Sequence, residues 1–153
     1  MIARVVDGTV TSELRRTVLR PTWPVGARMH GDREPQAVHL AVELDGAVVG
    51  ACLLLLRPYP RRPDEAGGWQ LRGMATAEQH RGRGIGSVLV DECVRQVLAR
   101  GGRVLWCEAR ESAIGFYAGH GFVGEGELFA HAETGIAHRL MYRELFGQAE
   151  ASS

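Results

Sequence analysis

The stretch Gln79-His80-Arg81-Gly82-Arg83-Gly84-Ile85-Gly86 is the part of the chain from which its fold can be worked out. It holds three alternating glycines, and an apolar helical pattern begins at its end. Glycine reaches positive φ and has no Cβ, so such a main chain curls tightly and approaches a ligand closely. Successive N–H groups that lead into a helix also gather partial positive charge at one point. The stretch therefore predicts a loop that binds phosphate oxygens.

Two common nucleotide-binding loops do not fit this stretch. A Walker loop needs a lysine before Ser or Thr, and all 18 basic residues of this chain are arginines. A dinucleotide-binding fingerprint needs a third glycine, but that place holds Ser87 when counted from Gly82 and Leu89 when counted from Gly84. The pattern that remains is Gln-x-x-Gly-x-Gly, formed by Gln79, Gly82 and Gly84.

Length and composition limit the class of protein. The 153 residues predict a single domain over 1–147 with a short polar tail at 148–153. A net charge of zero gives no bulk attraction to nucleic acid or to an anionic membrane. The longest apolar run, 47–56, is too short to span a bilayer, and the first residues contain no signal peptide. We therefore expect a cytoplasmic protein.

Cysteine and histidine usage gives no sign of a metal or redox centre. The three cysteines, Cys52, Cys93 and Cys107, lie in apolar runs without a Cys-x-x-Cys pair, so we expect reduced thiols in the core. The six histidines show no His-Glu-x-x-His or comparable spacing. No catalytic metal is expected.

The order of elements predicts a mixed α/β domain. Asp45-Gly46 is a strong signal for a tight hairpin, and the unbroken apolar run 47–56 is typical of a central strand buried on both faces. Thr11 or Ser12 is expected to cap the first helix and Ser112 the last. The proline-rich segment 20–36 is expected to be a functional loop. The predicted strands are 2–6, 38–43, 47–56, 69–76, 103–109, 123–130 and 136–143, and the predicted helices begin at 11, 85 and 112.

A second motif, Ala113-x-x-Phe116-Tyr117-x-x-x-Gly121-Phe122, joins the glycine stretch. With Gln79-x-x-Gly82-x-Gly84 it resembles the GNAT superfamily of N-acetyltransferases, and the stretches 106–110 and 135–138 resemble an uncharacterised bacterial subgroup. The resemblance implies a mixed central sheet of about six to seven strands with splayed fourth and fifth strands. About four helices would flank this sheet.

The resemblance also implies acetyl-CoA as cofactor, held largely by main-chain groups. Met74, Ala75 and Thr76 would contact the pantetheine arm. Arg110 stands where the family often has asparagine, so the usual role of that position is in doubt. The remaining cofactor-binding positions carried over are Gln79, Arg81, Gly82, Arg83, Gly84, Ile85, Gly86, Ala113 and Phe116.

Acetyl transfer to an amine needs a proton for the departing thiolate and a base for the amine. Tyr117 is the expected general acid, since a phenol with a pKa of ~10 roughly matches a thiol of ~8.5. The alternative is that Phe116 and Tyr117 are an aromatic pair of the core. Glu108 is the first candidate for the base, acting through water. Its rivals are Glu43, Glu78, Glu133 and His138.

Two functions from different classes remain. The first is an N-acetyltransferase that moves acetyl directly to a primary amine of a small molecule or peptide, within a ternary complex. The second is a non-catalytic acyl-CoA-binding module, and a dinucleotide-dependent oxidoreductase is a distant third. Loop 20–36, the first helix and turn 130–135 would select the amine. Asp32, Glu34 and Glu133 could attract a cation, but Arg28 and Arg33 make the polarity of these segments mixed, so it does not decide the substrate. A homodimer is left open.

Overall fold

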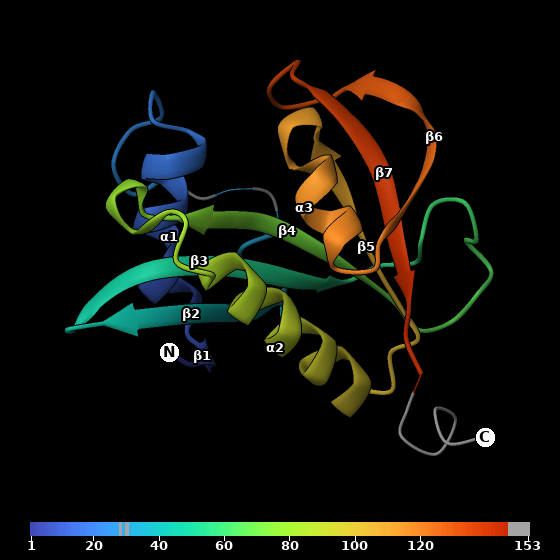
Figure 1. Cartoon of the computed structure of the whole chain (residues 1–153), viewed down its shortest axis with the longest axis horizontal. Coiled ribbons are helices and arrows are strands. Elements are labelled where there is room, and N and C mark those ends of the chain that lie inside the picture. Colours follow the sequence, from blue (N-terminus) through green and yellow to red (C-terminus); the bar gives the residue numbers. More distant parts are fainter. Residues whose placement is uncertain (28, 30, 147–153) are drawn as a thin grey trace. The chain divides into compact units, whose positions relative to one another are not determined.

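The computed structural model describes residues 1–27, 29 and 31–146 (Figure 1). These residues form a mixed sheet with the strand order β1-β2-β3-β4-β5-β7-β6. The sheet thus has seven strands, and the described helices are three α-helices and two short 3-10 helices. The elements are β1 (Ala3–Val6), α1 (Gly8–Leu19), β2 (Val38–Leu44), β3 (Ala47–Leu56), β4 (Gly68–Thr76), η1 (Glu78–His80), α2 (Ile85–Ala99), β5 (Val104–Arg110), η2 (Glu111–Ala113), α3 (Ile114–Gly119), β6 (Val123–Ala130) and β7 (Ala137–Glu144).

The chain divides into two compact units. Unit 1 comprises Met1–Leu56 and Leu71–Gln96, and unit 2 comprises Arg57–Gln70 and the chain from Val97 onward. Strand β4 runs from unit 2 into unit 1. The expected tail, 148–153, lies outside the described residues.

In unit 1, strands β1, β2 and β3 pair antiparallel around a tight hairpin. Asp45 and Gly46 adopt φ of 52° and 79°, as a type I′ turn requires. Strand β3 has the expected bounds, and its residues from Val49 to Leu55 are buried. Figure 1 shows α1 and α2 on opposite faces of these strands. This arrangement explains why β3 is apolar without alternation.

Helix α1 begins earlier than predicted. Its N-cap is Asp7, whose carboxylate accepts the Thr9 N–H at 2.9 Å. The predicted cap Thr11 lies instead inside the helix, fully buried, and its hydroxyl donates to the Gly8 carbonyl at 3.3 Å. Ser12 donates to the Thr9 carbonyl at 3.5 Å. An N-cap accepts a main-chain N–H, so both predicted caps are wrong.

In unit 2, the beginning of β4 pairs in parallel with β5, from Gly68↔Val104 to Gln70↔Trp106. Strand β5 then pairs antiparallel with β7, and β7 with β6. Tyr59, Val104 and Trp106 form the buried centre of this unit, and the Trp106 indole donates to the Arg57 carbonyl at 3.0 Å. The expected splaying of β4 and β5 beyond the pair Gln70↔Trp106 stays a prediction.

The last helix also differs from the prediction at its start. Ser112 lies within η2, and α3 follows from Ala113 without a side-chain cap. The helix ends at Gly119 with His120 as its C-cap, and the predicted stop residue Gly121 follows with a φ of 84°. The three cysteines are free and buried, as expected. Among the described helices, none has the length and apolar character needed to span a membrane.

Candidate functional site

The glycine loop leaves the end of β4 and leads into α2, all within unit 1. The Ala77 N–H donates to the Val49 carbonyl at 2.8 Å, which ties the exit of β4 to β3. One turn of 3-10 helix, η1, follows, and α2 begins at Ile85. The loop thus stands at the carboxyl end of a strand and at the amino end of a 15-residue helix, the place where open α/β sheets bind ligands.

The conformation of the loop depends on Gly82 and Gly84. Their φ angles are 80° and 79°, and a Cβ on either would meet nothing within 4 Å. Glycine is therefore required by the left-handed backbone and not by crowding inside the chain. The Gly84 carbonyl accepts the Val88 N–H at 3.1 Å, which starts the helix. The N–H groups of Ile85 and Gly86 precede this first helical hydrogen bond, so they can serve as donors on the open side of the loop.

Helix α2 is fixed against β3 by a small-to-large fit. Ile85 is 1% exposed, and a Cβ on Gly50 would lie 2.3 Å from its Cγ2 atom. Gly50 therefore leaves the space that Ile85 fills. Further along, the sulfur atoms of Cys52 and Cys93 lie 3.4 Å apart. Of the predicted cofactor residues, Ile85 thus has only its main chain available to a ligand.

The two arginines of the loop lie differently. The Arg83 guanidinium donates to Nδ1 of His80 at 3.2 Å, so this side chain folds back along the loop. Arg81 and Gln79 line a pocket of about 590 Å³ within unit 1. Both side chains come from the segment that precedes Gly82.

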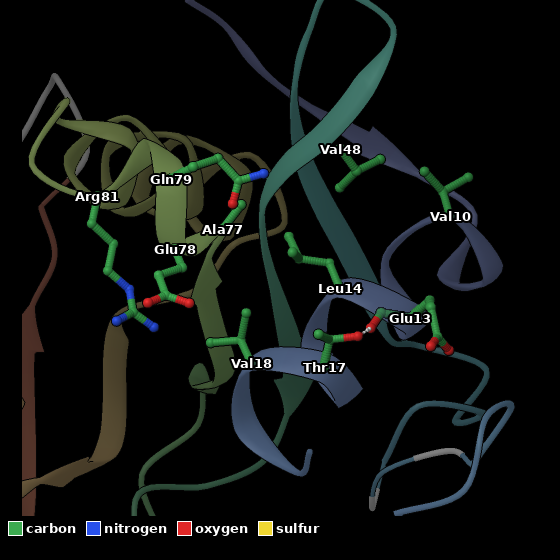
Figure 2. Close-up of a pocket in the computed structure, with 10 residues that line it drawn as sticks. All are labelled: Val10, Glu13, Leu14, Thr17, Val18, Val48, Ala77, Glu78, Gln79 and Arg81. Carbon is green, nitrogen blue, oxygen red and sulfur yellow. Dashed lines mark hydrogen bonds between the residues drawn. The ribbon is translucent and has the colours of Figure 1, made fainter.

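The pocket lies between the loop and helix α1 (Figure 2). The apolar part of its wall includes Val10, Leu14 and Val48, and its polar part includes Glu13. The guanidinium of Arg16 donates to Glu13 and lowers the pKa of that carboxyl. The pocket lining consists of Val10, Glu13, Leu14, Thr17, Val18, Val48, Ala77, Glu78, Gln79 and Arg81.

Met74, Ala75 and Thr76 form the last three residues of β4, directly before the pocket and loop segment. The Ala75 side chain is buried, and Met74 and Thr76 are half-buried. Gly73, which precedes them, has a φ of 60° within the strand. Unit 1 therefore brings together the predicted residues 74–76 and 79–86.

The predicted acid, Tyr117, lies in unit 2 on α3. Its ring centroid is 5.1 Å from that of Phe116 and 5.3 Å from that of Phe122, both with edge-on geometry. The side chain is 6% exposed. Arg143 donates to the His120 carbonyl at 3.0 Å and holds the end of this helix. Tyr117 thus packs in an aromatic cluster with Phe116, as the alternative interpretation expected, and its role as acid stays a prediction.

The predicted base, Glu108, faces a histidine that the sequence analysis did not name. Nε2 of His131 lies 3.5 Å from the Glu108 carboxylate. Nδ1 of His131 accepts the Glu133 N–H at 3.2 Å, so in the neutral ring the proton belongs on Nε2, toward Glu108. The pair thus keeps Glu108 as an oriented acceptor.

His138 completes this cluster. Its ring lies 4.5 Å from that of His131, with an angle of 36° between the planes. Its Nδ1 is 2.8 Å from the Ile136 carbonyl, to which it donates. His138 is 5% exposed. Arg110 lies opposite it in the β5–β7 register.

The other predicted residues are more scattered. Glu43 forms an ion pair with Arg4 across β1 and β2, a structural contact. Glu78 lines the pocket, whereas Glu133 is in the exposed β6–β7 connection. Ala113 immediately precedes α3. No group of three or more His, Cys, Asp or Glu side chains among the described residues is placed to hold a metal ion.

Comparison with known proteins gives a consistent family. Residues 11–122 match the model of the acetyltransferase (GNAT) family. An uncharacterised N-acetyltransferase of Bacillus subtilis, YitI, is 32% identical over 136 residues, which cover 88% of this chain and 90% of that protein.

Two solved structures share the fold of the chain. An aminoglycoside 6′-N-acetyltransferase complexed with coenzyme A has a TM-score of 0.72 at 18% identity, covering 97% of this chain and 99% of its own. A ribosomal-protein-alanine N-acetyltransferase of Brucella melitensis has a TM-score of 0.68 at 18% identity, covering 95% and 100%.

Proposed function

Because the chain belongs to the GNAT family of acetyltransferases, we propose that it moves an acetyl group from acetyl-CoA directly to a primary amine. The observation that carries the proposal is the loop at Gly82 and Gly84, which enters α2 with left-handed glycines and an open outer side. An anion as large as a diphosphate needs this bare main chain and the positive end of a helix.

The residues present fit coenzyme A. Substituents are missing where the main chain of the loop would approach phosphate, since a Cβ at Gly82 or Gly84 points into open space. The Arg81 N–H already donates to the Glu78 carbonyl at 3.3 Å, so N–H groups from Gly82 to Gly86 would hold the diphosphate, with the Arg81 side chain available to add charge. Main-chain groups of residues 74–76 would hold the pantetheine end. When bound, acetyl-CoA supplies an activated thioester.

The chain's own residues would then manage charge and protons. A main-chain N–H near residues 74–76 would stabilise the negative charge that develops on the acetyl oxygen. Tyr117 would give its phenolic proton to the sulfur as the carbon–sulfur bond breaks. The fixed aromatic cluster around Tyr117 supports this role, because a general acid must hold its position.

Glu108 is the proposed base. It would take a proton from the acceptor ammonium through a water molecule, so that the neutral amine can attack. The Nε2–H of His131 would orient the carboxylate. Two of its rivals are less suitable, because Glu43 is engaged with Arg4 and His138 donates to a carbonyl.

The acceptor would be selected by loop 20–36 and the β6–β7 connection, with one change from the sequence-based hypothesis. Asp32 is 5% exposed and forms an ion pair with Arg15 at 2.7 Å. Its charge is therefore neutralised inside unit 1 and cannot attract an amine, so that part of the hypothesis is wrong. Glu34 and Glu133 remain as acidic positions of these segments.

The proposal is tested by following free thiol during incubation with acetyl-CoA and a panel of amines. The panel contains a polyamine, an aminoglycoside and peptides with different amino termini, with coenzyme A affinity measured in parallel by calorimetry. Thiol release that depends on one amine class, with the acetylated amine seen by mass spectrometry, is the expected result. Binding of coenzyme A without release for any amine would instead support the non-catalytic module.

A further inference from the structure

A charged side chain lies at the centre of unit 1 with no part in the proposed chemistry. Arg15, on α1, is 1% exposed. Its Nη1 donates to the Asp32 carboxylate at 2.7 Å, its Nε donates to the Gly73 carbonyl at 3.2 Å, and its Nη2 lies 3.9 Å from the Met29 sulfur. One guanidinium thus joins helix α1, the loop after it and strand β4.

The contact with β4 falls where that strand departs from regular geometry. Gly73 has a φ of 60°, and a Cβ there would lie 2.3 Å from Nη2 and 2.4 Å from Nε of Arg15. A left-handed glycine inside a strand is typical of a bulge, which re-aims the residues beyond it. The guanidinium therefore fills the space beside Gly73 and binds the Gly73 carbonyl.

The hydrogen bonds around Asp32 fix the position of the Arg15 side chain. Asp32 accepts Nη1 with one oxygen, and its second oxygen accepts the Met29 N–H at 3.0 Å. His39 donates to the Asp32 carbonyl at 3.1 Å. A planar guanidinium with fixed donors is held in one orientation by such partners. A buried ion pair contributes little net stability compared with an apolar pair of similar size, so packing alone does not account for it.

We propose that Arg15 is a positioning residue, which holds the Gly73 carbonyl and thereby sets the direction of the main chain at Met74–Thr76. This inference rests on the proposed function, which assigns the acetyl thioester to that main chain. Asp32 orients Arg15, so loop 20–36 is linked to the same segment. Arg15 itself does not contact the reacting atoms.

The variant Arg15→Lys tests the role while keeping the positive charge beside Asp32. Lysine lacks the Nε–H that binds the Gly73 carbonyl and lacks the planar fork. The matched control is Arg95→Lys on α2, where an exposed arginine pairs with Glu92 at 2.7 Å. A variant without either charge, Arg15→Met with Asp32→Leu, makes the same test if the lysine variant does not fold.

The first measurement is amide hydrogen exchange, which needs no activity. Exchange at residues 74–76 is expected to become about tenfold faster or more in Arg15→Lys, since local opening sets the exchange rate. The amides of Leu40 and Leu53 in the core should be unchanged, and Arg95→Lys should match the wild type throughout. Unchanged exchange at 74–76 in a folded variant, or equal acceleration in the core, would overturn the proposal.

The second measurement separates turnover from affinity. A misplaced reactive segment is expected to lower kcat by about 10- to 100-fold. The Kd for coenzyme A should weaken much less, by about fivefold at most, because residues 74–76 hold only the pantetheine end and the diphosphate loop is untouched. A normal kcat in a folded variant overturns the role. If the wild type releases no thiol, the proposed function fails, and hydrogen exchange still decides the role of Arg15. Failure of both variants to fold would show that Arg15 and Asp32 are needed for folding, and would overturn the positioning role.

Discussion

Two substitutions at Gly84 test the effect of added negative charge on the loop separately from the effect of an added side chain. Asp and Asn have nearly the same size, and both tolerate the left-handed region better than other side chains. Because a Cβ at this position meets nothing within 4 Å, either side chain points to the open side of the loop. Gly84→Asp and Gly84→Asn should therefore lose a similar amount of stability, about 1 kcal/mol each.

The two variants should differ strongly in coenzyme A affinity. A carboxylate about 5 Å from a diphosphate with two negative charges is repelled by roughly 2–3 kcal/mol, for an effective dielectric constant of about 40–80. This repulsion corresponds to a Kd about 20- to 200-fold weaker for Gly84→Asp than for Gly84→Asn. The gap should narrow at high salt, since the Debye length falls from about 10 Å at 0.1 M to about 3 Å at 1 M.

Calorimetric titration with coenzyme A at both salt concentrations measures the two affinities, and urea unfolding measures the two stabilities. Gly46 provides the control, because its φ is also 79° with nothing within 4 Å of a Cβ, but it lies in the β2–β3 hairpin. Gly46→Asp and Gly46→Asn should bind coenzyme A equally. Equal affinity of the two Gly84 variants would refute the reasoning that this loop holds the diphosphate.

Four further predictions follow from the geometry. Tyr117→Phe should lower kcat by about 100-fold or more while coenzyme A affinity stays near wild type; an unaltered rate of thiol release would remove the acid role. Glu108→Gln should lower kcat at neutral pH by a similar factor of roughly 100. The loss should be smaller at high pH, because an amine that is already neutral needs no base, and a loss of kcat that does not depend on pH would contradict the role. Asp7→Ala should reduce the free energy of unfolding by about 1 kcal/mol, because the N-cap of α1 is lost; urea denaturation at neutral pH measures it, and an unchanged midpoint would argue against the cap. Burial raises the pKa of the Tyr59 phenol, and its hydrogen bond to Glu125 raises it further. The fold therefore favours the neutral phenol, so the stability of the wild type should be intact below the ordinary pKa of ~10 and decline as the pH rises above it. Unfolding of Tyr59→Phe between pH values of about 10 and 12 should show a shallower decline; parallel curves would contradict this assignment.

Local patterns in the sequence predicted those elements in which neighbouring residues decide the structure. Asp45-Gly46 fixes its own turn through two left-handed residues, and the apolar run 47–56 became β3 with the same bounds. The alternating glycines likewise predicted the loop between β4 and α2. In each case the information lies within a few residues of the chain.

Such local patterns could not predict contacts between residues that are distant in the sequence. Arg15 carries a charge that hydrophobic patterning does not assign to the core, yet it is buried with Asp32, 17 residues away. His131 meets Glu108 only because the β6–β7 hairpin returns past β5. Asp7 lies four residues before the predicted helix start at 11, because α1 already begins at Gly8.

The burial of the three cysteines has a practical consequence for enzymology. Cys52 and Cys93 have no exposed surface, Cys107 is 2% exposed, and burial raises the pKa of the Cys93 and Cys107 thiols. Thiolates attack a colorimetric disulfide reagent and release its coloured thiolate, so in native buffer colour should develop only with liberated coenzyme A. In denaturant the same reagent should count unfolded molecules. The same colorimetric thiol assay thus distinguishes a variant that has lost its turnover from one that has lost its structure.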